Sequence, residues 1–410
     1  MRAKQLALTF CLTLVAVVVL GFGLLHCGGN AYYSPGPGFP GTAAVAVADI
    51  NGDGKLDLVG SNPAYRGQAG FVTVRLQDST KPGGFQGPMR SSCGVNPGNL
   101  AVGSLGGATS AVAVVNQQAA PSVNAANTVS VLLPNSAQPG AFLAPVTLPV
   151  GSRNPQDVAL GDLTGQGMYA VAVAADGGSD LLLFVQTAPG VFAAPVSLPV
   201  GGVPTAVAMA DLNGDGLLDL AVATSGNLVS VLLQNPASPG TFLPHVDYTV
   251  GSNPVSVKAV PFTGGLPDLM VANYGTDLAP TTQGLSVLLH DPANAGAFLA
   301  AASYSTGDYG SCSVAVGDLN GDGRPDIAVA NYGLPATPGS VSVLLQDPAN
   351  PGKFLAPSLY PGITGPSFVA IGDLNGNGLN DLAIADGGMV VRFQVVGQPG
   401  VFGAPVAYQQ

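Results

Sequence analysis

The sequence predicts an all-β protein, a seven-bladed β-propeller made of four-stranded antiparallel blades. The composition of 58 Gly, 35 Pro and only 9% charged residues, with Asp supplying every acidic side chain, favours short strands and tight turns over helices. An Asp/Asn/Gly phrase recurs along the chain in register with a second phrase, Gly-x-Phe. The Gly-x-Phe phrase occurs seven times, with the phenylalanines Phe85, Phe142, Phe192, Phe242, Phe298, Phe354 and Phe402.

The first element, residues 1–27, has the layout of an export signal. Two basic residues precede an uncharged apolar run at 6–25, which is long enough for a signal peptide or for a membrane span. The residues around Cys27 resemble a bacterial lipobox, although His26 stands where that motif has a small residue. Lipidation of Cys27, cleavage near Ala31 and an uncleaved anchor are the alternatives. All three predict an exported bacterial protein, either a cell-surface lipoprotein or a secreted one.

Residues 28–410 repeat one unit every ~50–58 residues, a period typical of propeller blades. The unit has four parts: an apolar run before the Asp phrase, an apolar run from its last Asp, a third apolar run, and an extended segment after Gly-x-Phe. In the sixth copy these parts are Ser313–Gly317, Asp326–Asn331, Val341–Gln346 and Gly352–Pro357. Four short strands in each of seven copies predict seven blades.

The last segment, Ala404–Tyr408, follows the seventh Gly-x-Phe phrase. We expect it to complete the first blade and so close the ring, which would remove the open sheet edges. The segment Ala31–Pro35 is the alternative for the same place.

The Asp phrase reads Asp-x-Asn-Gly-Asp-Gly-x-x-Asp in three copies and has a softened fourth copy that begins at Asp373. Oxygen ligands at positions 1, 3, 5 and 9, with a main-chain carbonyl at position 7 and glycines for a tight turn, suit Ca²⁺. We therefore expect three to four calcium ions, with a plain turn without metal as the other interpretation. The predicted ligands are Asp49, Asn51, Asp53, Lys55 and Asp57; Asp211, Asn213, Asp215, Leu217 and Asp219; Asp318, Asn320, Asp322, Arg324 and Asp326; and Asp373, Asn375, Asn377, Leu379 and Asp381.

Three other copies of the loop, at 104–107, 162–170 and 262–268, have lost most of their carboxylates. We expect no metal in them. The net charge of −11 and the absence of a basic patch exclude nucleic acid as a partner. Four bound Ca²⁺ would cancel most of that charge, so a metal explains the acidity well.

These repeats resemble the FG-GAP/VCBS-type repeats of integrin α-subunit propellers and of many exported bacterial proteins. The resemblance covers about residues 31–410. It implies metal loops that support the blades and a face of loops that binds partners, while the breadth of the family leaves the function open.

No catalytic constellation stands out, so we expect a non-enzymatic interaction or adhesion module. His245 and His290 are the histidines beyond the leader, and His290 occupies a strand end that is Gln in other blades. The alternatives are a carbohydrate-active or other hydrolytic enzyme on a propeller scaffold and a structural cell-surface component. A tight His/Asp/Tyr cluster in one pocket would indicate the enzyme.

The candidate binding face lies opposite the calcium loops, where second strands lead to third strands and one blade leads to the next. Tyrosines in these connections would form an exposed rim able to contact a protein or stack on a sugar. Ordinary loop tyrosines that cap blade ends are the other interpretation. The predicted partner is an extracellular protein or polysaccharide, and membrane contact is expected only through the leader or a lipid anchor. The candidates for the rim are Tyr65, Tyr274, Tyr309 and Tyr332.

Overall fold

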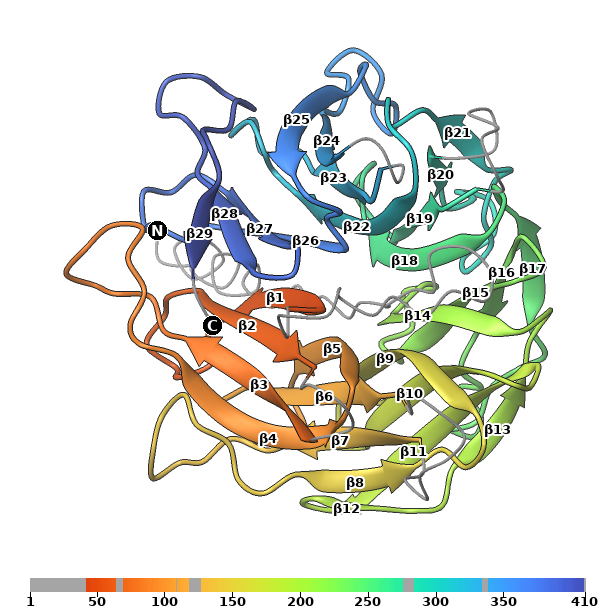
Figure 1. Cartoon of the computed structure of the whole chain (residues 1–410). Helices are drawn as coiled ribbons and strands as arrows, with labels where there is room; N and C mark the ends of the chain where they lie inside the picture. The colour runs from red at the N-terminus through yellow and green to blue at the C-terminus, as the bar shows by residue number, and fades with distance from the viewer. Residues whose placement is uncertain are drawn as a thin grey trace, which may run out of the picture.

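The computed structural model describes residues 42–63, 69–107, 109–117, 127–275, 284–333 and 338–408. They form seven antiparallel sheets arranged as a ring around a central axis (Figure 1). The predicted all-β fold with seven four-stranded blades is confirmed. No helix in these ranges has the length and apolarity needed to cross a membrane. The predictions for the leader, Cys27, Ala31–Pro35 and Tyr65 lie outside the described residues.

Each blade is one uninterrupted stretch of chain in which consecutive strands pair with each other, except that the short β12 and the outer strand β13 of blade three both pair with β11. Blades one to three contain β1 (Ala44–Ala48), β2 (Asp57–Asn62), β3 (Ala69–Arg75) and β4 (Met89–Val95); β5 (Pro97–Gly103), β6 (Ala111–Asn116), β7 (Thr128–Leu132) and β8 (Val146–Pro149); and β9 (Asn154–Asp162), β10 (Tyr169–Asp176), β11 (Asp180–Ala188), β12 (Val191–Phe192) and β13 (Val196–Pro199). Blades four and five contain β14 (Pro204–Ala210), β15 (Asp219–Thr224), β16 (Leu228–Leu232) and β17 (Val246–Thr249); and β18 (Pro254–Val260), β19 (Asp268–Asn273), β20 (Gly284–Leu288) and β21 (Ala302–Tyr304). Blades six and seven contain β22 (Ser311–Gly317), β23 (Asp326–Asn331), β24 (Gly339–Leu344) and β25 (Ser358–Ile363); and β26 (Phe368–Gly372), β27 (Asp381–Ala385), β28 (Met389–Arg392) and β29 (Val406–Tyr408).

The second strand of most blades is buried along its whole length, as in β2, β6, β15, β19 and β23. Its Val, Ala, Leu and Ile side chains pack on both faces of the blade against the neighbouring blades, which explains runs that are apolar throughout rather than alternating. The outer strands, such as β13 and β17, are largely exposed. The core of the molecule therefore consists of layers between blades.

The prediction that Ala404–Tyr408 completes the first blade is wrong. The segment forms β29, which pairs with β28 of the seventh blade through the register Met389↔Tyr408 to Val391↔Val406. Every outer strand is thus paired with the third strand of its own blade. In the described part of the chain, blades seven and one meet through side chains and share no strand pairing.

A repeated aromatic contact joins adjacent blades. A tyrosine six residues after the Gly-x-Phe phenylalanine of one blade packs edge-on against the phenylalanine of the next. The pairs and their centroid distances are Tyr248–Phe298 (5.5 Å), Tyr304–Phe354 (5.5 Å), Tyr360–Phe402 (5.4 Å) and Tyr408–Phe85 (5.0 Å). The last pair crosses the junction between blades seven and one, where the Tyr408 hydroxyl also donates to the Gly83 carbonyl at 2.6 Å.

Candidate metal centres

The loop between the first and second strands of a blade carries the Asp phrase. In blade one the Asp49 carboxylate sits at the centre of this turn: Oδ1 accepts from the backbone N–H of Gly52 at 2.7 Å and of Asp53 at 3.1 Å, and Oδ2 accepts from Gly54 at 2.8 Å. Gly52 and Gly54 have φ values of 78° and 83°, a region in which only glycine is unstrained. The two glycines therefore allow the backbone to turn around the Asp49 carboxylate.

The next two polar residues extend the same turn. The amide oxygen of Asn51 accepts from the backbone N–H of Asp53 at 2.9 Å, and Asp53 Oδ1 accepts from the N–H of Lys55 at 2.9 Å. Asn51 Nδ2 also donates to Asp53 Oδ2 at 3.1 Å. These bonds hold the oxygen-bearing side chains of positions 1, 3 and 5 within one turn of chain.

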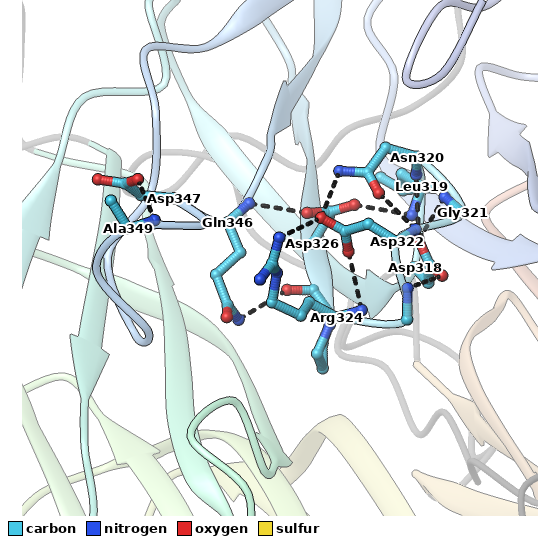
Figure 2. A network of polar contacts seen from close by, with 12 residues as sticks. Asp318, Leu319, Asn320, Gly321, Asp322, Arg324, Asp326, Gln346, Asp347 and Ala349 are labelled. Atoms are coloured by element: carbon cyan, nitrogen blue, oxygen red, sulfur yellow. Dashed lines mark hydrogen bonds and ion pairs between the residues drawn. The ribbon is translucent and has the colours of Figure 1, made fainter.

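Three other loops repeat this arrangement. The first Asp accepts from the N–H groups of the fourth, fifth and sixth residues at 2.6, 3.1 and 2.9 Å in the Asp211 loop, 2.6, 3.2 and 2.8 Å in the Asp318 loop, and 2.7, 3.1 and 2.7 Å in the Asp373 loop. Figure 2 shows the Asp318 loop, in which the Arg324 guanidinium also pairs with Asp322 at 2.9 Å. The softened Asp373 loop therefore keeps the geometry of the other three.

The last Asp of the phrase is buried and joins the loop to the third strand. Asp57 Oδ2 accepts from the N–H of Ile50 at 3.0 Å, and Oδ1 accepts from the N–H of Gln77 at 2.9 Å. Burial, together with a smaller effect of the charges of Asp53 and Asp49, raises the pKa of Asp57 to about 6. The pKa values of Asp219, Asp326 and Asp381 are likewise raised to about 6, first by burial and then by the acidic residues of their loops.

Blade five shows that this last Asp accepts the same two backbone hydrogen bonds even where the rest of the phrase is missing. Its shortened loop keeps only Asp268, yet the carboxylate accepts from the N–H of Phe262 at 2.8 Å and of His290 at 2.7 Å. Both bonds are equivalent to those of Asp57. Position 9 is therefore a structural hydrogen-bond acceptor in five blades, which sequence reasoning missed because it treated this residue only as a metal ligand.

The role of the glutamine at the end of the third strand was also missed. The side chains of Gln77, Gln234, Gln346 and Gln394 are at most 5% exposed, and each donates to a main-chain oxygen in the loop of the preceding blade. The acceptors are Asp373, Leu163, Phe262 and Leu319, respectively. The signal was present in the sequence, because each glutamine precedes its Gly-x-Phe phenylalanine by the same spacing and bridges to it.

The donor set of the four loops fits calcium. Each supplies two or three carboxylates, one or two amide oxygens and a main-chain carbonyl, all hard oxygen ligands. A carboxylate oxygen that accepts one N–H keeps a second lone pair for a cation. Among the described residues, no three His, Cys, Asp or Glu side chains converge closely enough to hold a metal. The argument that the loops suit calcium therefore rests on the type of their ligand atoms and on the shape of the turn.

Comparison with known families agrees with this geometry. An FG-GAP repeat matches residues 41–74, and an FG-GAP-like repeat matches residues 162–222 and 265–329. The chain contains FG-GAP and FG-GAP-like repeats within a seven-bladed propeller. The matched ranges include the Asp49, Asp211 and Asp318 loops, the degraded loop at 162–170 and part of the one at 262–268. The resemblance inferred from the sequence is therefore confirmed.

No curated protein matches the sequence. Among solved structures, a chain in the BBS1N–ARL6DN complex is 12% identical with a TM-score of 0.57, covering 93% of this chain and 99% of that one. A functionally unknown protein from Desulfotomaculum acetoxidans is 14% identical (TM-score 0.53; 83% and 96% covered), as is the periplasmic gluconolactonase PpgL of Pseudomonas aeruginosa (TM-score 0.52; 84% and 96%). At such identities these similarities show the fold alone.

Three of the four predicted rim tyrosines, Tyr274, Tyr309 and Tyr332, are half-buried. Tyr274 and Tyr332 pack against the cores between blades, and both lie beside Gly310. Their backbone N–H groups bond to the carbonyls of Asn253 and Gly310, each at 2.9 Å. These three residues are therefore partly exposed, and Tyr274 and Tyr332 also contact the core. Their role in binding stays a prediction.

His245 and His290, the histidines within the described ranges, do not form a nucleophilic triad. His245 Nδ1 lies 2.9 Å from Asp247 Oδ1, and the Ser230 hydroxyl donates to the same oxygen at 2.6 Å. The aspartate thus lies between the two, whereas general-base activation of serine needs the histidine in the middle. His290 contacts Asp268 at 3.1 Å on a different blade.

Proposed function

We propose that this chain is an exported, calcium-stabilised FG-GAP propeller that acts as a non-enzymatic interaction or adhesion module. Its partner is an extracellular protein or polysaccharide, bound at the face opposite the metal loops. The observation that carries the proposal is a difference in regularity between the two faces of the ring.

On the metal face, the connections between first and second strands span six to eight residues in all seven blades. On the opposite face, the connections between second and third strands range from three residues, at 177–179, to eleven, at 117–127. Variable loops on a rigid, regular scaffold are the usual place for recognition. The longer connections belong to two pairs of adjacent blades, namely one with two and five with six; they are 63–68, 117–127, 274–283 and 332–338.

The calcium part of the proposal is supported by the charge of the loops. Asp49, Asp53 and Asp57 are close enough for the first two to raise the pKa of the third. A divalent cation would offset this repulsion and hold the ends of two strands together. A bound ion in such a loop is surrounded by the chain's own ligands, which favours a structural over a catalytic role.

The non-enzymatic part is supported by the separation of the candidate acid–base groups. His245 lies beside β17 and His290 at the end of β20, and each contacts an aspartate that already accepts other hydrogen bonds. The fold itself does not favour either an enzymatic or a non-enzymatic role, because similar solved structures include both a protein complex and a gluconolactonase. The proposal therefore rests on the residues of this chain.

An exchange of loops tests the binding face. Residues 274–283 and 332–338 are each replaced by the three-residue connection of blade four, 225–227. Binding of the full-length chain to arrays of polysaccharides and immobilised extracellular-matrix proteins is then measured. We expect binding to fall at least about tenfold while the melting temperature stays within a few degrees, because surface-loop length has little effect on stability.

The matched control replaces 225–227 with residues 177–179 of blade three, which changes sequence but not length. Unchanged binding by the shortened variants would contradict the proposed face. Turnover of sugar lactones or aryl glycosides by the wild-type chain would contradict the non-enzymatic role.

A further inference from the structure

The junction between blades seven and one is unlike the other six. The chain itself crosses every other junction, for example from β4 to β5, whereas no chain segment leads from β29 to β1. In the described residues, no strand pairing crosses the junction either. Among the described residues, opening it breaks only side-chain contacts, so we expect the ring to separate here at the lowest cost in free energy.

Side chains hold this junction. Besides the Tyr408–Phe85 contact, the Ser367 hydroxyl donates to the Ala43 carbonyl at 3.0 Å. Apolar side chains of both blades share one core, in which Phe368 and Met389 of blade seven pack with the valines of blade one. These contacts resemble those at other junctions and do not make up for the missing covalent link.

Three loops with the full Asp phrase and the softened Asp373 copy, together called the complete metal loops here, are distributed unevenly around the ring. Blades six, seven and one carry them consecutively, in the loops that begin at Asp318, Asp373 and Asp49, and blade four carries the remaining one. Blades two, three and five have degraded loops. Three of the four complete loops are therefore contiguous across the uncrossed junction.

Hydrogen bonds connect these three loops. Asn380, in the loop of blade seven, donates to the main-chain carbonyl of Asp318 at 2.8 Å. Gln77, in blade one, donates to the main-chain carbonyl of Asp373 at 3.2 Å. In both cases the acceptor belongs to the first residue of a loop, whose carboxylate organises the whole turn. A metal that holds the carboxylate of this residue in place also holds its main-chain carbonyl, which accepts a hydrogen bond from the next blade.

We propose that calcium closes the ring. The loops at Asp318, Asp373 and Asp49 act as one coupled array across the junction, and loss of metal from this array opens the junction before the rest of the propeller unfolds. The inference rests on the calcium binding proposed above, and it adds a specific purpose for three of the four loops.

Hydrogen exchange of the full-length chain tests where calcium acts. Amide exchange is compared in millimolar Ca²⁺ and in EDTA. We expect β1, β26 and the turn at 78–84 to exchange at least about tenfold more slowly in calcium, because these segments face the junction. The matched reference is the junction between β5 and β9, where blades two and three meet without a complete loop and a smaller change is expected.

Two glutamine variants test the coupling. Gln77→Ala removes the donor to Asp373 and leaves every predicted ligand in place. Gln234→Ala is the matched control. Gln234 donates in the same way to the main-chain carbonyl of Leu163 at 2.9 Å, and Leu163 belongs to the degraded loop of blade three. In calcium titrations followed by calorimetry, we expect Gln77→Ala to weaken binding about five- to tenfold, which is typical of coupled sites, and Gln234→Ala to leave it unchanged.

The outcomes separate the two proposals. If metal analysis and calorimetry detect no bound calcium, both proposals fail. If calcium binds but slows exchange equally in all blades, or if the two glutamine variants behave alike, calcium binding stands and ring closure by calcium is overturned.

Discussion

At the scale of single residues, the last Asp of the loop phrase has the clearest role. Asp57 and its equivalents each accept two backbone N–H groups from different segments, and Asp268 does the same in a blade without the other acidic ligands. The carboxylate therefore ties the loop to the third strand even where no metal is expected. The proposed metal binding and the architecture of the loop thus depend on the same residue.

Substitution separates these two roles. Asp219→Ala and Asp268→Ala each leave two N–H groups without their acceptor, so we expect each to lower the free energy of unfolding by about 2–4 kcal/mol in EDTA. Urea denaturation measures this loss. Added calcium should stabilise the wild type and Asp268→Ala alike, whereas Asp219→Ala should lose the part contributed by its own loop. An equal calcium response in both variants would argue against a metal in the Asp211–Asp219 loop.

The raised pKa values predict a pH dependence without metal. Asp57, Asp219, Asp326 and Asp381 have pKa values of about 6, above the usual 3.8. Because the folded state binds these protons more tightly than the unfolded state, their stabilising effect is complete below about pH 4 and is lost as the pH rises through about 6. Thermal melts in EDTA should show it. In calcium the trend should reverse, since the ion binds ionised carboxylates; parallel curves in both conditions would contradict this.

At the scale of secondary-structure elements, the tyrosine–phenylalanine contacts between blades can be tested by substituting the residue that other blades of this chain have in place of the tyrosine. Blades two and three have Leu148 and Leu198 where blades four to seven have the tyrosine. Tyr360→Leu removes the contact with Phe402 and the hydrogen bond to the Gly400 carbonyl at 2.7 Å.

We expect Tyr360→Leu to lower the free energy of unfolding by about 1–3 kcal/mol, the sum of an aromatic pair and a hydrogen bond. Tyr360→Phe keeps the ring, so its loss should be about 1 kcal/mol. Denaturant titrations compare the two. Equal losses would show that the ring contact contributes nothing.

Periodicity predicted the elements well because each blade repeats the same apolar runs and turn residues. The second strand of blade six, expected at Asp326–Asn331, is β23 with the same bounds. The Asp, Asn and Gly residues of each loop could be assigned to a tight turn because their hydrogen bonds are local, as those of Asp49 show.

Contacts between blades could not be predicted in this way. Whether β29 pairs with blade seven or with blade one depends on how the two blades lie relative to each other, and no local sequence pattern determines this. The same applies to Asp157 and Lys258, which lie on different blades and are 1% and 4% exposed. The Lys258 charge partly counters the rise that burial causes in the pKa of Asp157, a relation between residues about a hundred positions apart.

At the scale of the whole molecule, calcium should stabilise the propeller by mass action, since the unfolded chain has no assembled loops. We expect the melting temperature to drop by many degrees when millimolar Ca²⁺ is replaced with EDTA. Restored calcium should reverse the drop, and Mg²⁺ should do so poorly because it demands a smaller octahedral site. Differential scanning calorimetry measures this, and identical melts in Ca²⁺ and EDTA would mean that the loops are turns without a metal.

The use of one uninterrupted stretch of chain for each blade has a consequence for how such a protein can be re-engineered or can evolve. Since no blade borrows a strand, a circular permutant that begins at β14 and joins Tyr408 to Thr42 through a short linker would keep every strand pairing. It would move the covalent break to the boundary of blades three and four. By the same logic, duplication or deletion of a gene segment of one repeat length adds or removes a whole blade, so the fold is modular at the level of the gene.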